Sequence, residues 1–370
     1  MLLLLLNAAL AKSWCAAELV VHEWGVAVFP ASQGELPSHF HTQGPTEARE
    51  LPSVLHLPPD TGERAKPVVS FHVAHPEYAR EIPLALSVGF TQGRPKAWYP
   101  QVDQLRSSRL SSGTLVEAEA LREARAARTL PAIQAATWAD EALPEVGHEP
   151  THQLIWDPLT LSREPHNSLP WTAEPWVQDQ REVPGLYVNR GEESERFLFY
   201  EGLISEEPSV VLRDGELVNV GDWPVHELLY VLPDGRWMPV GTLEPGASVP
   251  LDPIESEGDL SPRRWLLDQL SLPVYSRPET GGFGLGRECV MTRDPAIPVT
   301  SASDHRLYRG EVGVLLGAWD QELFHSDQPV LVYREDAEQL AALAPISVYT
   351  SMSWYVTLRR LSLVISAPGA

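Results

Sequence analysis

The chain has 370 residues, a formal net charge of -22 and an apolar fraction of 43%. This length is sufficient for two domains of ordinary size, and the apolar fraction excludes a mainly disordered chain. So acidic a chain lacks the cationic surface that binding to nucleic acid or to an anionic membrane requires. The 34 prolines favour strands joined by turns and loops over long helices.

The first 17 residues are typical of an export signal. Residues 2–6 and 8–11 form a short apolar run, and Ala16 and Ala17 are small residues of the kind that precede a signal-peptidase cleavage site. The run is too short to span a bilayer. We therefore expect a signal peptide over 1–17 and an extracytoplasmic protein, periplasmic or secreted, with no membrane span after cleavage. The alternative is an N-terminal extension on a cytoplasmic protein.

The stretch from Val20 to Phe29 is the most informative segment that follows. In an extended strand, His22 and Trp24 lie on one face and Glu23 lies on the other, among mainly apolar neighbours. Burial of an imidazole or a carboxylate is costly unless a partner is supplied. We therefore expect a central buried strand with a partner for each group, and arginine is favoured for Glu23 because its fork matches both carboxylate oxygens. The two groups are then either a paired part of the core or a functional site.

Further strands are predicted through most of the region before residue 260, where apolar residues alternate between turn signals. They are expected at 67–74, 82–91, 153–161, 185–189, 196–204, 209–219 and 226–240. Gly93 is expected to turn the chain into a β-hairpin with residues 96–100. The pairs Asp214-Gly215 and Asp234-Gly235 are typical of tight hairpin turns. Strong helix formers over 115–130 predict one peripheral helix.

The last third has more helical character. A helix is expected over 262–270, with Pro262 in its first turn. Residues 308–324 predict an amphipathic helix, whose apolar positions recur every 3.6 residues at Val312, Leu315, Leu316, Trp319 and Leu323. Strands follow at 329–333 and 354–365, with a short helix near 336–343 between them.

These elements predict a mostly β protein made of sandwich-like packed antiparallel sheets, with a smaller C-terminal α+β portion. The expected boundaries are a signal peptide over 1–17, a β-rich domain over 18–260, composed of one or two subdomains, and the α+β portion over 261–370.

Four short blocks also occur in a familiar order along the chain. They are His22-Glu23-Trp24-Gly25, Lys66-Pro67-Val68-Val69-Ser70-Phe71, Trp98-Tyr99-Pro100 and Arg196-Phe197-Leu198-Phe199-Tyr200-Glu201-Gly202. With them, the chain resembles a family of uncharacterised exported bacterial proteins that open with a His-Glu-Trp-Gly-Thr-Phe block. The resemblance implies export and architecture but no activity. This chain has Val26 and Ala27 in place of the family's Thr and Phe, and Glu201 in place of an Arg.

The histidines are concentrated near the N-terminus, and they suggest a metal site. Those before residue 80 are His22, His39, His41, His56, His72 and His75. His39 and His41 lie on one side of an extended segment, and His72 and His75 close a strand end. Zinc or copper accepts such nitrogens, with Glu23, Glu35 or Asp60 able to complete a site. A divalent metal ion bound by His39, His41, His72 and His75 is therefore one hypothesis, and histidines that are solvated or paired in the core are the other.

A second candidate site surrounds the opening strand and combines acids with aromatic residues. Its members are His22, Glu23, Trp24, Trp98, Tyr99, Tyr200 and Glu201. Glu23 and Glu201 each lie in an apolar strand beside an aromatic residue, as the paired carboxylates of a glycosidase do. The 12 tryptophans either stack on sugars or peptides or fill the core. A nucleophile is not indicated, because no Gly-x-Ser-x-Gly elbow occurs and Cys289 has no adjacent base.

These observations favour an exported binding or structural protein whose ligand is a small molecule, a glycan or a protein. The alternative is an exported hydrolase that uses a metal or carboxylate site near His22 and Glu23. A metal-binding protein without catalysis is the third class.

The export hypothesis predicts where the mature chain begins. N-terminal sequencing of the exported protein should give Glu18 or a close neighbour as the first residue, because the small residues end at Ala17. Protein that keeps Met1 and remains in the cytoplasm would contradict export.

Overall fold

The computed structural model describes residues 18–29, 62–73, 81–91, 93–107, 134–135, 152–172, 174–204, 206–256, 260–272, 305–351 and 355–368. Within them the chain is mostly β, as predicted. The strands are β1 (Glu18–Phe29), β2 (Gly62–Val73), β3 (Ile82–Phe90), β4 (Gly93–Tyr99), β5 (Gln104–Ser107), β6 (Gln134–Ala135), β7 (His152–Ser162), β8 (Tyr187–Arg190), β9 (Glu193–Glu195), β10 (Phe197–Ile204), β11 (Val210–Arg213), β12 (Glu216–Asn219), β13 (Val225–Val231), β14 (Trp237–Leu243), β15 (Ser248–Pro250), β16 (Val330–Arg334), β17 (Ile346–Thr350) and β18 (Tyr355–Ser366). The helices are α2 (Pro175–Glu182), α3 (Pro262–Leu270), α4 (Arg309–Ala318), α5 (Asp320–Phe324) and α6 (Ala337–Leu343).

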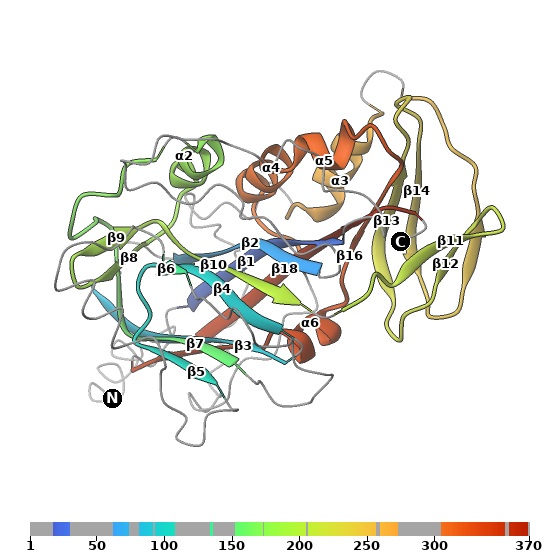
Figure 1. Cartoon of the computed structure of the whole chain (residues 1–370). Helices are drawn as coiled ribbons and strands as arrows, with labels where there is room; N and C mark the ends of the chain where they lie inside the picture. The colour runs from blue at the N-terminus through green and yellow to red at the C-terminus, as the bar shows by residue number, and fades with distance from the viewer. Residues whose placement is uncertain are drawn as a thin grey trace, which may run out of the picture.

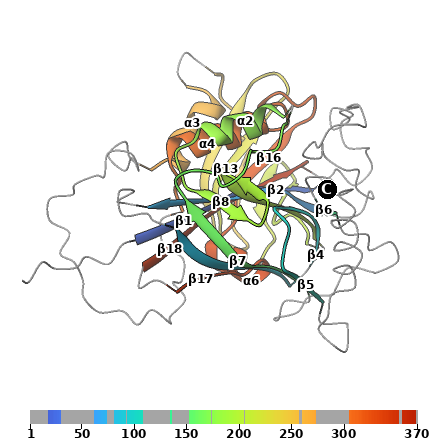
Figure 2. The same cartoon turned by 90° about the vertical axis from the view of Figure 1, so that its left-hand side faces the viewer.

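The strands form three sheets in layers. A nine-stranded central sheet has the order β14-β13-β16-β18-β1-β2-β10-β4-β6, a second sheet contains β17-β3-β7-β8-β9, and a small sheet contains β11-β12-β15. Helices α2, α3, α4 and α5 cover one face of the central sheet, and β3, β5 and β7 lie across the other (Figure 1). The view from the side shows the same layers (Figure 2). The sheets pack face to face, as predicted, and helices add a third layer.

Strand β1 lies inside the central sheet, between β18 and β2. It pairs with β18 in parallel and with β2 antiparallel, so this part of the sheet is mixed. Trp24, Val26 and Val28 pack against the helices, whereas Val21 packs against the second sheet. The predicted division of β1 into two buried faces is therefore confirmed.

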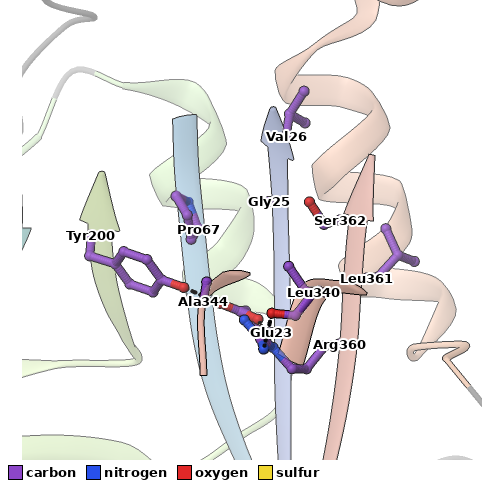
Figure 3. A pocket seen from close by; sticks show the side chains of 10 residues that line it. All are labelled: Glu23, Gly25, Val26, Pro67, Tyr200, Leu340, Ala344, Arg360, Leu361 and Ser362. Carbon is purple, nitrogen blue, oxygen red and sulfur yellow. Dashed lines mark hydrogen bonds and ion pairs between the residues drawn. The ribbon is translucent and has the colours of Figure 1, made fainter. Parts of the chain in front are cut away.

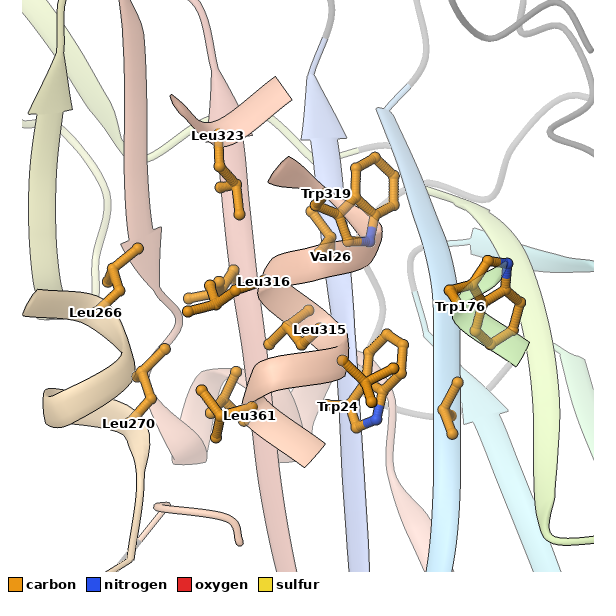
Figure 4. Packing of buried hydrophobic residues seen from close by; sticks show 14 of the residues in the cluster. Trp24, Val26, Trp176, Leu266, Leu270, Leu315, Leu316, Trp319, Leu323 and Leu361 are labelled. Carbon is orange, nitrogen blue, oxygen red and sulfur yellow. The ribbon is translucent and has the colours of Figure 1, made fainter. Parts of the chain in front are cut away.

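The helix layer packs on β1 through the apolar stripe of α4. Leu315 and Leu316 are buried in one cluster with Trp24 and Leu361 of the sheet (Figure 4). The predicted helix over 308–324 is divided at Trp319, whose φ of -122° and ψ of 18° lie outside the helical range. Trp319 and Leu323 are both buried, so the predicted apolar stripe holds across the break.

Local turn predictions have mixed outcomes. The hairpins at Asp214-Gly215 and Asp234-Gly235 are confirmed by the pairs β11–β12 and β13–β14, and both glycines have a positive φ. The predicted hairpin at Gly93 is wrong. β3 belongs to the second sheet and β4 to the central sheet, so the chain crosses between layers there.

Two C-terminal strands lie within the central sheet. β16 and β18 fall between β13 and β1, so residues from the predicted β-rich and α+β portions share one sheet. Among the helices that the structure describes, none is long and apolar enough to cross a membrane. The predicted helix over 115–130 lies outside the described residues.

Candidate functional site

His22 and Glu23 each belong to a buried polar cluster, and the two clusters lie on opposite faces of β1. His22 and His72 contact Glu311 of the helix layer. Glu23 contacts Tyr200 and Arg360 on the face toward the second sheet. Both residues therefore have the partners that burial on both sides of β1 led us to expect.

The first cluster joins three elements. His22 Nδ1 is 2.7 Å from Glu311 Oε2, and His72 Nε2 is 3.0 Å from Glu311 Oε1. In the β1–β2 register His22 lies opposite Ser70 and Val20 opposite His72, so the two histidines are diagonal neighbours on one face. Glu311 is in the first turn of α4 and reaches the sheet from above. Its side chain and that of His22 are fully buried, and that of His72 is 1% exposed.

Tyr308 covers this cluster at the start of α4. Its backbone N–H donates to Glu311 Oε2 at 3.2 Å. Its ring centroid is 4.7 Å from that of His22 and 4.9 Å from that of His72. Burial raises the pKa of Tyr308 to about 12, so the phenol is neutral at physiological pH.

The electrostatics of the cluster give a carboxylate beside a neutral imidazole. Burial lowers the pKa of His22 below 6.5, and the attraction to Glu311 offsets this only in part. Burial alone would raise the pKa of Glu311, but attraction to His22 and His72 and their hydrogen bonds hold it well below its usual range. An ionised carboxylate and a neutral imidazole are the forms in which these groups bind a metal ion.

The geometry of the three groups is compatible with one bound ion. Their ligand atoms all lie within 4.8 Å of one another. Two ligands at about 2.0–2.1 Å from one ion are separated by roughly 2.9–3.4 Å. The separations of 2.7 and 3.0 Å to Glu311 are close to this range, whereas the widest separation in the group, up to 4.8 Å, must shorten when an ion binds.

One of the predicted metal ligands belongs to this cluster. His72 lies in this cluster beside His22, whereas His39, His41 and His75 lie outside the described residues. Glu311 was not predicted. The sequence feature from which it could have been predicted is its position four residues before Leu315, on the apolar stripe of a helix. A carboxylate at such a position is buried and needs a partner.

The second cluster is built around Glu23. Tyr200 Oη donates to Glu23 Oε1, and Arg360 Nε donates to Glu23 Oε2. Arg360 Nη1 also donates to the carbonyl oxygen of Leu340, at 3.2 Å. Figure 3 shows the carboxylate between the phenol and the guanidinium, at one end of a small pocket. The expectation that an arginine pairs with Glu23 is confirmed.

The other predicted site residues do not converge on either cluster. Trp24 donates through its indole N–H to Gln180 Oε1 at 3.2 Å and so ties β1 to α2. Trp98 packs between the two sheets, and Tyr99 packs on the helix side. Glu201 is buried beside a register shift in β10 and is not among the residues that line the pocket beside Glu23.

The tryptophans mainly fill the interior. Trp98 and Trp237 have no exposed surface and Trp176 is 7% exposed, whereas Trp171 is 60% exposed. Trp98, Trp176 and Trp237 therefore fill the core. Trp171 has an exposed ring, which can stack on a ligand.

No family model matches this chain, and no curated protein matches it. Solved structures with a weak likeness to it include the following two. The Fcho1 Mu homology domain of Danio rerio with bound Eps15 peptide has 10% sequence identity, covers 97% of each chain and has a TM-score of 0.23. The yeast delta-COP-I mu-homology domain complexed with Dsl1 WxWxV peptide has 7% identity, covers 95% of this chain and 97% of that chain, and has a TM-score of 0.22. TM-scores this low establish no shared fold, so neither ligand is carried over to this chain.

Replacement of Glu23 tests the buried ion pair. Glu23→Gln should lower the free energy of unfolding by about 1–3 kcal/mol, because the amide has one oxygen where Tyr200 and Arg360 each donate to a carboxylate oxygen, so one buried donor loses its acceptor. Urea unfolding measures this. Asp234→Asn, which neutralises an exposed partner of Arg236, is the control and should leave stability unchanged. Equal effects of the two changes would contradict a structural role for the pair.

The lowered pKa of His22 predicts a pH dependence of the metal-free protein. Well above pH 6.5, His22 is neutral in both the folded and the unfolded chain, so its titration does not lower the free energy of unfolding there. As the pH falls through 6.5, His22 binds a proton in the unfolded chain but stays neutral in the folded protein. The free energy of unfolding therefore decreases until the pH reaches the lower pKa that His22 has in the folded protein. The urea concentration at the midpoint of unfolding should therefore decrease as the pH is lowered from about 7 to about 5.

Replacement of His22 isolates this contribution. His22→Gln should show a shallower decline than the unmodified protein, since the titrating group is gone. His166→Gln removes a half-exposed histidine that contacts Glu81 and serves as the control. An unchanged slope in His22→Gln would show that the decline has another origin.

Proposed function

We propose that the protein is an exported binding protein whose ligand is a divalent transition-metal ion, held by His22, His72 and Glu311. One observation carries this proposal. Three side chains with metal-ligating atoms, from β1, β2 and α4, converge within 4.8 Å in the interior. Convergence of groups so distant in sequence requires the complete fold, so the site is absent from the unfolded chain.

The ligand set favours particular metals. Two imidazole nitrogens and one carboxylate oxygen suit Zn²⁺ and neighbouring transition metals, whereas Ca²⁺ and Mg²⁺ prefer oxygen alone. The buried carboxylate also benefits from a cation, because a buried charge without compensation is costly. His22 Nε2 and His72 Nδ1 have no hydrogen-bond partner among the described residues. Metal binding through the nitrogens that face Glu311 places the ring protons on these two atoms, which then act as donors.

Binding is favoured over hydrolysis by the surroundings of the cluster. Its three side chains are buried beneath Tyr308 and α4, and a hydrolytic metal keeps a position open to substrate and water. The proposed hydrolase site would also combine His22 with Glu23, which act on opposite faces of β1. Export is supported by the pattern of residues 1–17 and by the family resemblance of the sequence.

Thermal unfolding with and without Zn²⁺ tests the proposal. In untagged protein freed of metal by a chelator, Zn²⁺ should raise Tm, because an ion that binds only the folded state stabilises it by RT ln(1 + [L]/Kd), about 2.7 kcal/mol at 100 times Kd. The variants His72→Gln and Glu311→Gln should lose most of this shift.

His226→Gln is the matched control. His226 also pairs with a carboxylate, with Nε2 3.0 Å from Asp336 Oδ2, but within the described part of the chain it does not belong to a group of three metal-ligating residues. It should keep the full Zn²⁺ shift. A Zn²⁺ response that persists in Glu311→Gln, or that is absent from the unmodified protein, would overturn the proposal.

A further inference from the structure

The Arg360 guanidinium on the other face of β1 has an incomplete set of hydrogen bonds. Its Nε donates to Glu23 and its Nη1 to the carbonyl oxygen of Leu340. Its Nη2 is buried and has no hydrogen-bond partner among the described residues. A charged donor left unsatisfied inside a protein is costly, so an acceptor is expected there.

Arg360 lines a small pocket that can hold such an acceptor. The pocket lies between β1, β2, β10, β18 and α6 (Figure 3), and it is lined by Glu23, Gly25, Val26, Pro67, Tyr200, Leu340, Ala344, Arg360, Leu361 and Ser362. Its cavity volume is ≈ 10 Å³. One water molecule requires about 10–15 Å³, so the pocket has room for about one water molecule.

The charges that line the pocket restrict the chemistry of its occupant. Glu23 and Arg360 form an ion pair with side chains that are each 5% exposed. The carboxylate repels an anion, and the guanidinium repels a cation. A neutral molecule that both donates and accepts hydrogen bonds suits the site, and only water is small enough.

We infer that one structural water molecule is bound in this pocket and accepts a hydrogen bond from Arg360 Nη2. The water molecule then donates hydrogen bonds to oxygen atoms that line the pocket. The side chains of Glu23 and Ser362 both have oxygens that can accept them. The water completes the hydrogen bonding of Arg360 and allows the ion pair to remain buried. The inference is independent of the metal proposal, since the pocket is on the opposite face of β1.

A crystal structure at a resolution that shows ordered water tests this directly. One water oxygen should lie about 2.7–3.2 Å from Arg360 Nη2. An empty pocket, a protein acceptor on Nη2, or density for a larger group would each overturn the inference.

Filling the pocket gives a second test in solution. Ala344 is 1% exposed and lines the pocket, so Ala344→Val places two methyl groups where the water is inferred. Displacement of the water leaves Nη2 unsatisfied, and Tm should fall by roughly 2–5 °C. Ala341→Val, on the exposed side of α6, is the control and should change Tm less.

The sign of the change separates a wet pocket from a dry one. If the pocket were empty, the added methyl groups would fill a void, and Ala344→Val would be as stable as the control or more stable. That outcome, together with a crystal structure without the water, would overturn the inference. A lower Tm with the water present in the unmodified crystal supports it.

Discussion

Burial of β1 on both faces is the constraint on which the rest of the structure depends. Two adjacent residues of this strand, His22 and Glu23, are polar and point in opposite directions, so neither can reach solvent. Each needs a partner from another segment of the chain. The helix layer provides Glu311 for His22, and the central sheet provides Tyr200 and Arg360 for Glu23.

These partners tie the two ends of the chain together. Glu311 is 289 residues from His22, and Arg360 is 337 residues from Glu23. The parallel pairing of β1 with β18 sets the register that places Glu23 opposite Arg360. The Glu23 cluster therefore requires the pairing of β1 with β18, and the His22 cluster requires α4 to pack on the central sheet.

The opening strand was predictable because its information is local. Alternation along β1 determines which residues share a face. The need for a partner at His22 and at Glu23 follows from the cost of burying a polar group. The hairpins at Asp214-Gly215 and Asp234-Gly235 were predictable for the same reason, since each turn depends on two adjacent residues.

The identities of distant partners were not predictable in this way. Glu311 occupies the first turn of a helix, where an acidic residue is ordinary, and only its place on the apolar stripe marks it as buried. At Gly93, which is the first residue of β4, the sequence did not distinguish a hairpin from a chain that crosses between two sheets. Glu201 follows Tyr200 directly, and adjacent residues of a strand face opposite ways, which is one reason why Tyr200 meets Glu23 and Glu201 does not line their pocket.

The central claim is that His22, His72 and Glu311 form a cation site. Anomalous diffraction at the zinc absorption edge, from crystals of the untagged protein grown with Zn²⁺, tests it most directly. We expect one anomalous peak about 2.0–2.1 Å from an imidazole nitrogen of each histidine and from a Glu311 oxygen. Crystals with no peak there, in which the three side chains remain joined only by hydrogen bonds, would contradict it.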